Sequence, residues 1–329
     1  MGVLYATVTI DWEGIKLEDD CLNYLEFFKK QFSEIPLTHF LCPAYFTRGK
    51  NLAAQIKKMQ TLTKDDEIGL HIHSWKSLIT KSSVEPQLQP NCHPKPPKVT
   101  YGDGKKDEGF AVPLGIYTIP QIRQILRTSK QILIETDITA TECVSFRCGA
   151  WFASDAVFSA LAEEGFKNDA SAVPPNWLST VTESALPIFA SWIRHLWGKH
   201  ETKTPHYLAN TLIHRTYPKG IQSCLSQHEH SISQPQILAN DIVEVPDTGL
   251  LMDYTPPSVL YHYIQQAWKL SKQTDTYISF GFHLESANAS TTFSENIPFL
   301  IGLIQVLLAI KQEGIHINYL KLNQVRETL

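Results

Sequence analysis

The sequence lacks the apolar runs and basic clusters that would place the protein in a membrane or on nucleic acid. Nowhere in its 329 residues do 18 uninterrupted apolar residues occur, so no membrane-spanning helix is predicted. The formal net charge is −4, from 29 basic and 33 acidic residues, and the basic residues are scattered. We therefore expect neither a nucleic-acid partner nor binding to an anionic membrane surface.

Cysteine is scarce, and its spacing indicates neither a metal site nor a disulfide framework. The six cysteines follow no repeated spacing and include no Cys-x-x-Cys pair (Cys21, Cys42, Cys92, Cys143, Cys148 and Cys224). In a chain of this length we expect free thiols in a reducing compartment. No basic segment precedes the apolar residues at the N-terminus, which predicts a first core strand and not a signal peptide. A cytoplasmic protein is expected.

Two common families of catalytic motif are also missing. No Gly-x-Gly-x-x-Gly or Walker-type loop follows an expected strand, so a nucleotide is not indicated. There is no Gly-x-Ser-x-Gly elbow of the kind that carries a nucleophilic serine. The chemistry must therefore be sought in other patterns.

What the chain does contain is a regular alternation of strand and helix patterns. Hydrophobic residues make up 43% of the sequence, enough for a large core. Strands are expected at 3–10, 37–46, 68–73, 143–147, 242–246, 277–283 and 316–322. Helices are expected at 22–32, 52–60, 119–135, 154–164, 258–272 and 299–313. Repeated strand–helix units predict a parallel sheet covered by helices, either open or closed into a barrel.

Two stretches interrupt this alternation within what we expect to be a single domain, 1–329. Residues 76–115 are rich in proline and glycine and predict a long loop excursion, which could act as a lid or binding loop or be partly disordered. Residues 177–240 form an irregular insertion without a clear pattern. This insertion contains His228 and His230, whose polar surroundings do not favour a metal site.

The segment 67–75 is the most informative part of the sequence. It reads as a short buried strand that ends in two histidines, His71 and His73. Because side chains alternate along a strand, both imidazoles point the same way. Neutral imidazole is the commonest nitrogen ligand, so the two can hold one divalent metal ion. The same alternation places Asp11 and Glu13 on one face at the end of the first strand.

Further polar side chains fall at the ends of later strands. Arg147, Asp247 and His283 each follow an apolar run. In a parallel α/β barrel these carboxyl ends share one rim, where active sites form. Taken singly, each has a structural reading: the two acids as caps of the next helix, Arg147 as an ion-pair partner, and His283 as a hydrogen-bonded core histidine. Their joint position favours a site.

These motifs resemble those of the polysaccharide deacetylase superfamily, also known as carbohydrate esterase family 4 or NodB-homology proteins. The resemblance is strongest to the branch encoded with surface-polysaccharide genes, and it extends over residues 3–322. It rests on five motifs in the family's order, at 9–14, 67–75, 145–151, 244–247 and 280–283. It implies an α/β fold, an irregular NodB-like (β/α) barrel with about seven parallel strands.

The resemblance also implies a reaction, the removal of N-acetyl groups from an amino sugar or polysaccharide precursor. Metal ligands would be Glu13, His71 and His73, and the ion Zn²⁺ or another divalent metal such as Co²⁺ or Ni²⁺. Asp11 would be the catalytic base and His283 the general acid.

The third and fourth motifs supply the remaining expected site residues. Arg147 would orient the catalytic base and keep it ionised. Trp151, Trp75 and Asp247 would bind the N-acetylated carbohydrate. The sequence makes no prediction of the oligomeric state.

Two departures from the family pattern leave alternatives open. Trp12 separates two carboxylates that are usually adjacent, and Trp75 stands four residues after His71, where the second histidine ligand is usual. His73 must then replace that ligand. One alternative is a metal-independent or cyclic-amide hydrolase of the allantoinase-like kind on the same barrel. Another is a degenerate barrel that binds a glycan without cleaving it.

Overall fold

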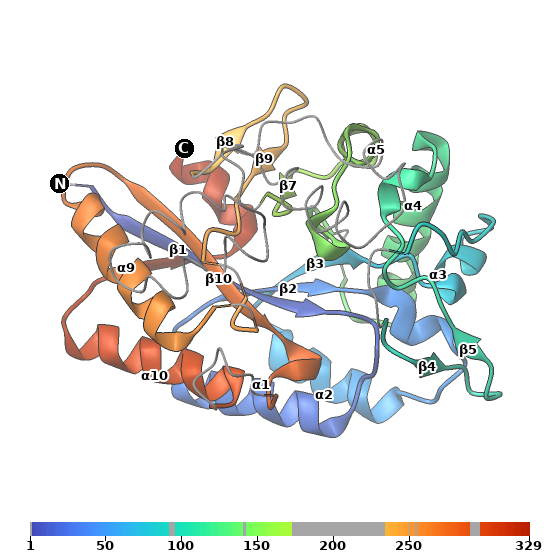
Figure 1. The fold of residues 1–329 in the computed structure, drawn as a ribbon, viewed down its shortest axis with the longest axis horizontal. Helices are drawn as coiled ribbons and strands as arrows, with labels where there is room; N and C mark the ends of the chain where they lie inside the picture. The colour runs from blue at the N-terminus through green and yellow to red at the C-terminus, as the bar shows by residue number, and fades with distance from the viewer. Residues whose placement is uncertain are drawn as a thin grey trace.

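The computed structural model describes residues 2–91, 96–140, 143–172, 234–249, 251–253, 255–289 and 297–329. Its centre is a nine-stranded sheet in the order β10-β1-β2-β3-β6-β7-β9-β8, with β11 also paired to β1. The sheet curls into a half-barrel whose outer face is covered by helices (Figure 1). The α/β barrel predicted from the sequence is confirmed. The insertion at 177–240, with His228 and His230, lies outside the described residues as far as residue 233.

Every strand pair in this sheet is parallel except β8 with β9. The strands are β1 (Leu4–Trp12), β2 (Leu37–Leu41), β3 (Glu67–Ile72), β6 (Ser145–Cys148), β7 (Asn168–Asp169), β8 (Gln236–Ile237), β9 (Val243–Glu244), β10 (Thr276–His283) and β11 (Asn318–Leu320). The expected strand at 37–46 ends at Leu41, and a 3₁₀ helix, η1 (Pro43–Thr47), follows. Proline has no N–H to donate to a ladder, which accounts for the early end.

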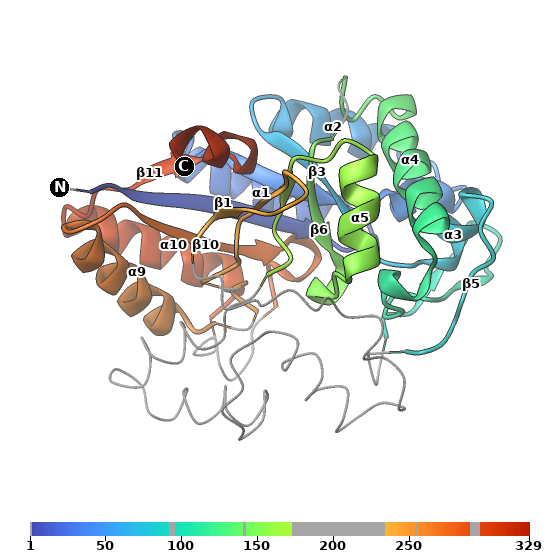
Figure 2. The ribbon, with the colours of Figure 1, turned by 90° about the horizontal axis from the view of Figure 1, so that it is seen from above.

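The helices are α1 (Asp19–Gln31), α2 (Ala53–Thr63), α3 (Lys76–Lys81), α4 (Ile119–Glu135), α5 (Asp155–Glu163), α9 (Pro257–Ser271) and α10 (Phe299–Gln312). Six of these helices lie close to the expected positions, whereas α3 falls in the range expected to be a loop. Seen from above, α9 lies beside α10 and α4 beside α5 (Figure 2). Thr118 and Gln121 form a capping box at the start of α4, and Ser154 caps α5 by accepting a hydrogen bond from the Val157 N–H. None of the helices in the described part of the chain is long and apolar enough to cross a bilayer.

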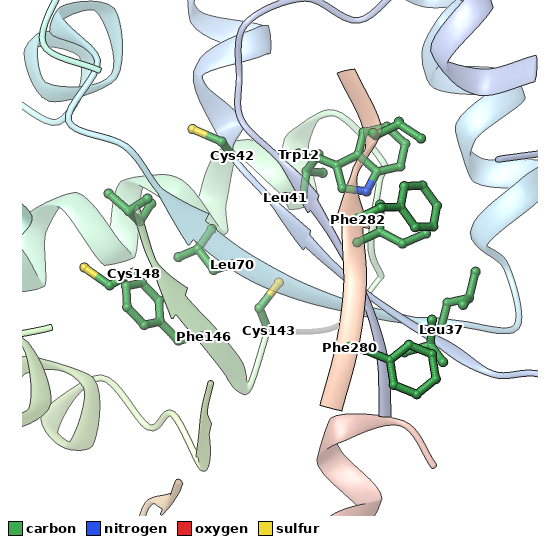
Figure 3. Close-up of a cluster of buried hydrophobic side chains, with 14 of the residues drawn as sticks. Trp12, Leu37, Leu41, Cys42, Leu70, Cys143, Phe146, Cys148, Phe280 and Phe282 are labelled. Atoms are coloured by element: carbon green, nitrogen blue, oxygen red, sulfur yellow. The ribbon is translucent and has the colours of Figure 1, made fainter. Parts of the chain in front are cut away.

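The hydrophobic core lies between the sheet and these helices. Trp12, Leu41, Leu70, Phe146 and Phe282 come from five neighbouring strands and pack into it (Figure 3). Because side chains alternate, the residues beside them on each strand turn to the opposite, concave face of the sheet. The polar residues at the strand ends lie on that face.

The segment that follows β9 pairs with β10, at the other end of the sheet. Leu251 forms a parallel bridge with Gly281, and the Met252 N–H donates to the Gly281 carbonyl at 2.9 Å. The Gly249 N–H donates to the Ser279 carbonyl at 2.6 Å. The segment after β9 thus returns to β10, which brings its side chains to the rim.

The proline-rich range 76–115 contains more structure than a loop. It begins with α3 and includes an antiparallel hairpin, β4 (Val99–Thr100) with β5 (Lys106–Asp107), and a 3₁₀ helix, η2 (Leu114–Ile116). Asp107 and Val112 are buried, so the second half of the range packs against the barrel.

Candidate active site

The sheet register places four polar side chains next to one another at the carboxyl ends of the strands. Asp11 pairs with His283 across β1 and β10, and His71 pairs with Arg147 across β3 and β6. Glu13 and His73 each lie one residue beyond their strand, and both are buried. The strand ends therefore meet at one rim, as the sequence predicts.

The carboxylate of Glu13 is at the centre of this group. Its Oε1 lies 3.3 Å from His71 Nε2 and 3.2 Å from His283 Nε2, and its Oε2 lies 2.7 Å from His73 Nε2. Burial alone would raise the pKa of Glu13, but His73 and His283 hold it well below its usual value. Glu13 is therefore a charged carboxylate among three imidazoles.

Two of these imidazoles are oriented by backbone carbonyls. His71 Nδ1 donates to the Arg147 carbonyl at 2.9 Å, and His73 Nδ1 donates to the Phe110 carbonyl at 2.8 Å. A ring nitrogen held in this way fixes the tautomer and leaves Nε2 available to a metal ion. Both Nε2 atoms are directed at Glu13.

The residues present fit a divalent metal ion. One ligand atom each from Glu13, His71 and His73 can be chosen so that all lie within 4.8 Å of one another. Two ligand atoms of one tetrahedral zinc ion lie roughly 3.3 Å apart. Among the described residues, His73 Nε2 has no hydrogen bond of acceptable geometry, although Glu13 is close. This arrangement suits His73 Nε2 and Glu13 Oε2 as two ligand atoms of one metal ion.

Arg147 holds Asp11 from below the rim. The Arg147 Nη1 donates to Asp11 Oδ1 at 2.8 Å and to Thr9 Oγ1 at 3.0 Å, and its Nε donates to the Ala170 carbonyl at 3.0 Å. Arg147 is fully buried, and its guanidinium stacks on the Phe40 ring, 4.5 Å from the ring centroid. This charge-assisted bond fixes the position of the Asp11 carboxyl group at the rim.

His283 has a carboxylate partner that the sequence analysis did not identify. Its Nδ1 lies 3.2 Å from Asp253 Oδ2, while its Nε2 faces Glu13. Burial opposes the charge on His283, but Asp253 and Glu13 outweigh burial and hold its pKa well above the usual value. Asp253 follows Leu251, whose pairing with β10 is a tertiary feature that no local sequence pattern reveals.

Comparison with known proteins gives similarity only at the level of structure. No family model and no curated protein matches this sequence. A Mycobacterium smegmatis protein assigned as a polysaccharide deacetylase has a TM-score of 0.53 and 10% identity, covering 99% of this chain and 90% of its own. PuuE allantoinase has a TM-score of 0.50 and 10% identity, covering 97% of this chain and 88% of its own. The chain has the polysaccharide deacetylase fold.

The resemblance drawn from the five motifs is therefore confirmed for the fold. The same fold does not select one reaction. A 4-α-glucanotransferase from Thermococcus litoralis also matches, with a TM-score of 0.52 and 9% identity, covering 100% of this chain and 41% of that chain. Function must be argued from the side chains at the rim.

The two departures from the deacetylase motifs have structural explanations. Trp12 lies on the helix-facing side of β1, so Asp11 and Glu13 share the concave face although they are not adjacent. The Trp12 indole N–H donates to His39 Nδ1 at 3.1 Å, and His39 Nε2 lies 3.0 Å from Asp66 Oδ2. The extra residue is thus anchored in the core.

Trp75 supports the site from within the protein. It is fully buried, and its indole N–H donates to the Glu13 carbonyl at 2.9 Å. Its contact with the site runs through the Glu13 backbone, and a role for Trp75 in sugar binding stays a prediction. In this deacetylase fold the tryptophan at the usual ligand position holds the backbone of another expected ligand.

Asp247 and Trp151 differ in their access to solvent. Asp247 is fully buried, and its Oδ2 lies 3.5 Å from Arg147 Nη2. Burial raises the pKa of Asp247 to about 6, against the opposing effect of Arg147. A role for Asp247 in substrate binding stays a prediction. Trp151 is partly exposed and, with Ala150, has a positive φ (58° and 53°). Such strain in non-glycine residues is concentrated at functional sites.

Glu285 is a further buried acid beside Glu13. It accepts hydrogen bonds from the Glu13 N–H at 3.3 Å, from the Ile15 N–H at 3.4 Å and from the Tyr45 hydroxyl. Burial, and then the charge of Glu13, raises the pKa of Glu285 to about 7. Its position two residues after His283 is visible in the sequence, but its contact with the loop after β1 depends on the pairing of β10 with β1.

Proposed function

We propose that the protein is a metal-dependent hydrolase that removes N-acetyl groups from an amino sugar or polysaccharide precursor. The observation that carries this proposal is the clustering of Glu13, His71 and His73 next to the Asp11 and His283 pair. A pure binding site needs neither an acid nor a base at that position. The fold is compatible with this chemistry and does not decide it.

The ligands for the ion would be Glu13, His71 and His73. Imidazole and carboxylate ligands suit Zn²⁺, and Co²⁺ or Ni²⁺ can occupy similar sites. When bound, the ion would supply Lewis acidity, which acidifies water and polarises an acetamide carbonyl.

The acid and the base come from neighbouring strands. Asp11, held in place by Arg147, accepts the proton of the attacking water. His283, protonated beside Asp253, donates a proton to the amine nitrogen as the C–N bond breaks. Water is consumed, and the products are acetate and a free amino sugar. The partly exposed Trp151 offers an apolar face against which a sugar ring can lie.

One observation favours a second candidate, a metal-independent hydrolase of small cyclic amides. Glu13 Oε1 lies 3.2 Å from His283 Nε2, and the raised pKa of His283 favours its charged form, so the charge of Glu13 can be balanced without a metal ion. Asp11 and His283 would then act alone as base and acid. The two candidates differ in their need for metal.

The test is acetate release from N-acetylated oligosaccharides before and after removal of metal. We expect exhaustive chelation to abolish activity and Zn²⁺ or Co²⁺ to restore it. Glu13→Ala should bind no ion, and one retained equivalent of zinc in that variant would refute the ligand assignment. Full activity after chelation would favour the metal-independent hydrolase. Binding of the oligosaccharide without acetate release would show a non-catalytic glycan-binding protein.

A further inference from the structure

A buried ion pair outside the proposed ligand set joins every segment that carries a ligand. The pair is formed by Arg48, after η1, and Asp107, in the β4–β5 hairpin, with Arg48 Nε 2.6 Å from Asp107 Oδ2. Both side chains are almost fully buried. A buried pair of this kind contributes little to stability by itself, so its contacts are the more informative feature.

The Arg48 side of the pair holds the backbone that follows Glu13. Its Nη1 donates to the carbonyls of Gly14 and, at 3.3 Å, Ile15. Its guanidinium also stacks on Trp75, 4.6 Å from the ring centroid, and the Trp75 indole in turn donates to the Glu13 carbonyl. Arg48 therefore holds the backbone at and after Glu13. It binds the carbonyls of the next two residues directly, and it supports the Glu13 carbonyl through Trp75.

The Asp107 side holds the turn that follows His73. Its Oδ1 accepts from the Ser77 N–H at 2.9 Å, and its Oδ2 accepts from the Ser77 hydroxyl at 2.7 Å. Next to it, the Lys76 N–H donates to the Glu108 carbonyl at 2.7 Å. The hairpin is thus bound to the first residues of α3, three and four positions after His73.

These contacts deliver Phe110 to the His73 ring. The two rings stack with centroids 3.9 Å apart and planes 9° apart, and the Phe110 carbonyl accepts from His73 Nδ1. Gly109 makes the approach possible, since it has a φ of 92° and a Cβ there would lie 2.4 Å from the Ser74 carbonyl oxygen. The carbonyl that fixes the tautomer of His73 therefore comes from the segment that directly follows the hairpin.

We propose that Arg48 and Asp107 are positioning residues, which orient His73 and Glu13 for metal binding by fixing the hairpin against the rim. The proposal rests on the metal centre proposed above and adds to it the residues that set its geometry. It also explains how a histidine two residues after His71 can serve as a ligand. The partner of His73 Nδ1 is the Phe110 carbonyl, 37 residues further along the chain. Trp75, at the usual ligand position, supports the backbone of Glu13 instead.

The test compares substitutions of the pair with a matched control pair. Asp107→Asn removes the negative charge of the pair, and Arg48→Lys removes the guanidinium group. Gly109→Ala leaves the pair intact but displaces Phe110. The control is Arg123→Lys or Glu164→Gln, at an ion pair with the same 2.6 Å Nε–O distance between α4 and the end of α5. Zinc affinity is measured by chelator competition, and the visible spectrum of the Co²⁺ form reports ligand geometry.

We expect the three test variants to bind zinc about 10–100-fold more weakly, as is usual when a partner of a ligating histidine is lost. Their Co²⁺ spectra should change, and the control variants should match the parent protein in both measurements. Thermal unfolding is followed in parallel. A lower Tm with unchanged zinc affinity and an unchanged Co²⁺ spectrum would show that the pair is only structural and would overturn the proposal.

A second measurement separates this proposal from the proposed function. In metal-free protein, ¹⁵N NMR should show a protected Nδ1–H of His73 in the parent and control proteins, lost in Asp107→Asn and Gly109→Ala. If the parent protein binds no divalent ion, the proposed metal-dependent function is refuted. The His73 Nδ1–H signal in metal-free protein then still shows whether Arg48 and Asp107 orient His73. A His73 Nδ1–H that persists in both variants refutes the positioning role. Gly109→Ala keeps both charges, so it serves if the charge variants do not fold.

Discussion

His283 lies between two carboxylates, one beside each ring nitrogen. Asp253 contacts Nδ1, and Glu13 lies near Nε2. A histidine that donates a proton must be charged at the working pH. Burial opposes that charge, and the two carboxylates more than compensate, so the pKa of His283 is raised well above its usual value. Asp253 is therefore as important to the proposed acid as the imidazole itself.

We predict that Asp253→Asn shifts the alkaline limit of activity to lower pH. His283 must be protonated to act, so activity is lost as pH rises through its pKa. Removing the charge of Asp253 lowers that pKa, because Asp253 is the larger source of the charge that holds it high. The measurement is the pH dependence of kcat/KM for acetate release. Asp275→Asn, at the opposite end of β10, is the matched control and should leave the profile unchanged; an equal shift in both variants would exclude a specific role for Asp253.

Among the elements, β10 depends on one glycine. Gly281 lies between β1 and the returning segment at Leu251, and a Cβ there would lie 1.8 Å from the Thr9 carbonyl oxygen. A side chain at this position cannot be accommodated unless β10 moves away from β1. Since Asp11 and His283 are register partners across these strands, such a movement would also separate the base from the acid.

We predict that Gly281→Ala lowers the free energy of unfolding by about 3 kcal/mol, the upper part of the range for overpacked sites. The measurement is urea unfolding followed by circular dichroism. Gly314→Ala at the end of α10 is the control, because open space surrounds it and only its φ of 70° is strained. Its expected cost is about 1 kcal/mol. Equal losses in the two variants would contradict the close approach of β10 to β1.

Among the helices and strands, those that follow an apolar pattern in the sequence were predictable, and those without such a pattern were not. The apolar stripe of α4 gave its limits, 119–135, as observed, and the strand ending in His283 was placed within one residue. The two-residue strand β7 and the β4–β5 hairpin lie outside the predicted strands because no apolar run surrounds them, whereas the equally short β9 lies inside the apolar run at 242–246. β7 and the hairpin form where neighbouring strands and the Arg48–Asp107 pair provide partners, which is a tertiary effect.

For the molecule as a whole, the sequence predicts those site residues that lie at strand ends, and it does not predict those that other segments bring to the rim. Asp11, Glu13, His71, Arg147 and His283 end strands or directly follow them, and a parallel sheet brings such residues to one rim. Asp253 and Phe110 come from segments that fold back onto the rim, so no local pattern marks them. The roles of the predicted residues remain proposals, whereas their proximity is observed.

The interior of the barrel contains more buried carboxyls than Arg147 can balance. Asp11 and Asp247 face the guanidinium, and Asp169 and Glu244 lie in register on β7 and β9. Burial raises the pKa of Asp169 to about 6, and burial followed by the charge of Asp169 raises that of Glu244 well above its usual value. Because each carboxyl opposes the ionisation of the other, we expect the pair to keep a proton above the pH at which an ordinary carboxylic acid loses it.

We predict that the free energy of unfolding falls as pH rises from about 5 to 8. An acid whose pKa is raised in the folded state stabilises the protein fully below its unfolded pKa, and that contribution is lost as pH rises through the folded pKa. For Asp169 and Glu244 this window begins near their ordinary values, 3.8 and 4.5, and extends to 6 and above. The measurement is urea unfolding across the pH range.

Glu244→Gln should flatten this dependence and be more stable than the parent protein at pH 8. The glutamine amide copies the protonated acid, because its oxygen can accept from the Ala172 N–H, as Glu244 Oε1 does at 2.9 Å, while its NH₂ group donates to Asp169. Glu313→Gln on the exposed end of α10 is the control and should follow the parent curve. If Glu244→Gln keeps the full pH dependence, the proton is held elsewhere in the interior, with Asp247 as the next carboxyl to substitute, since burial raises its pKa to about 6 as well.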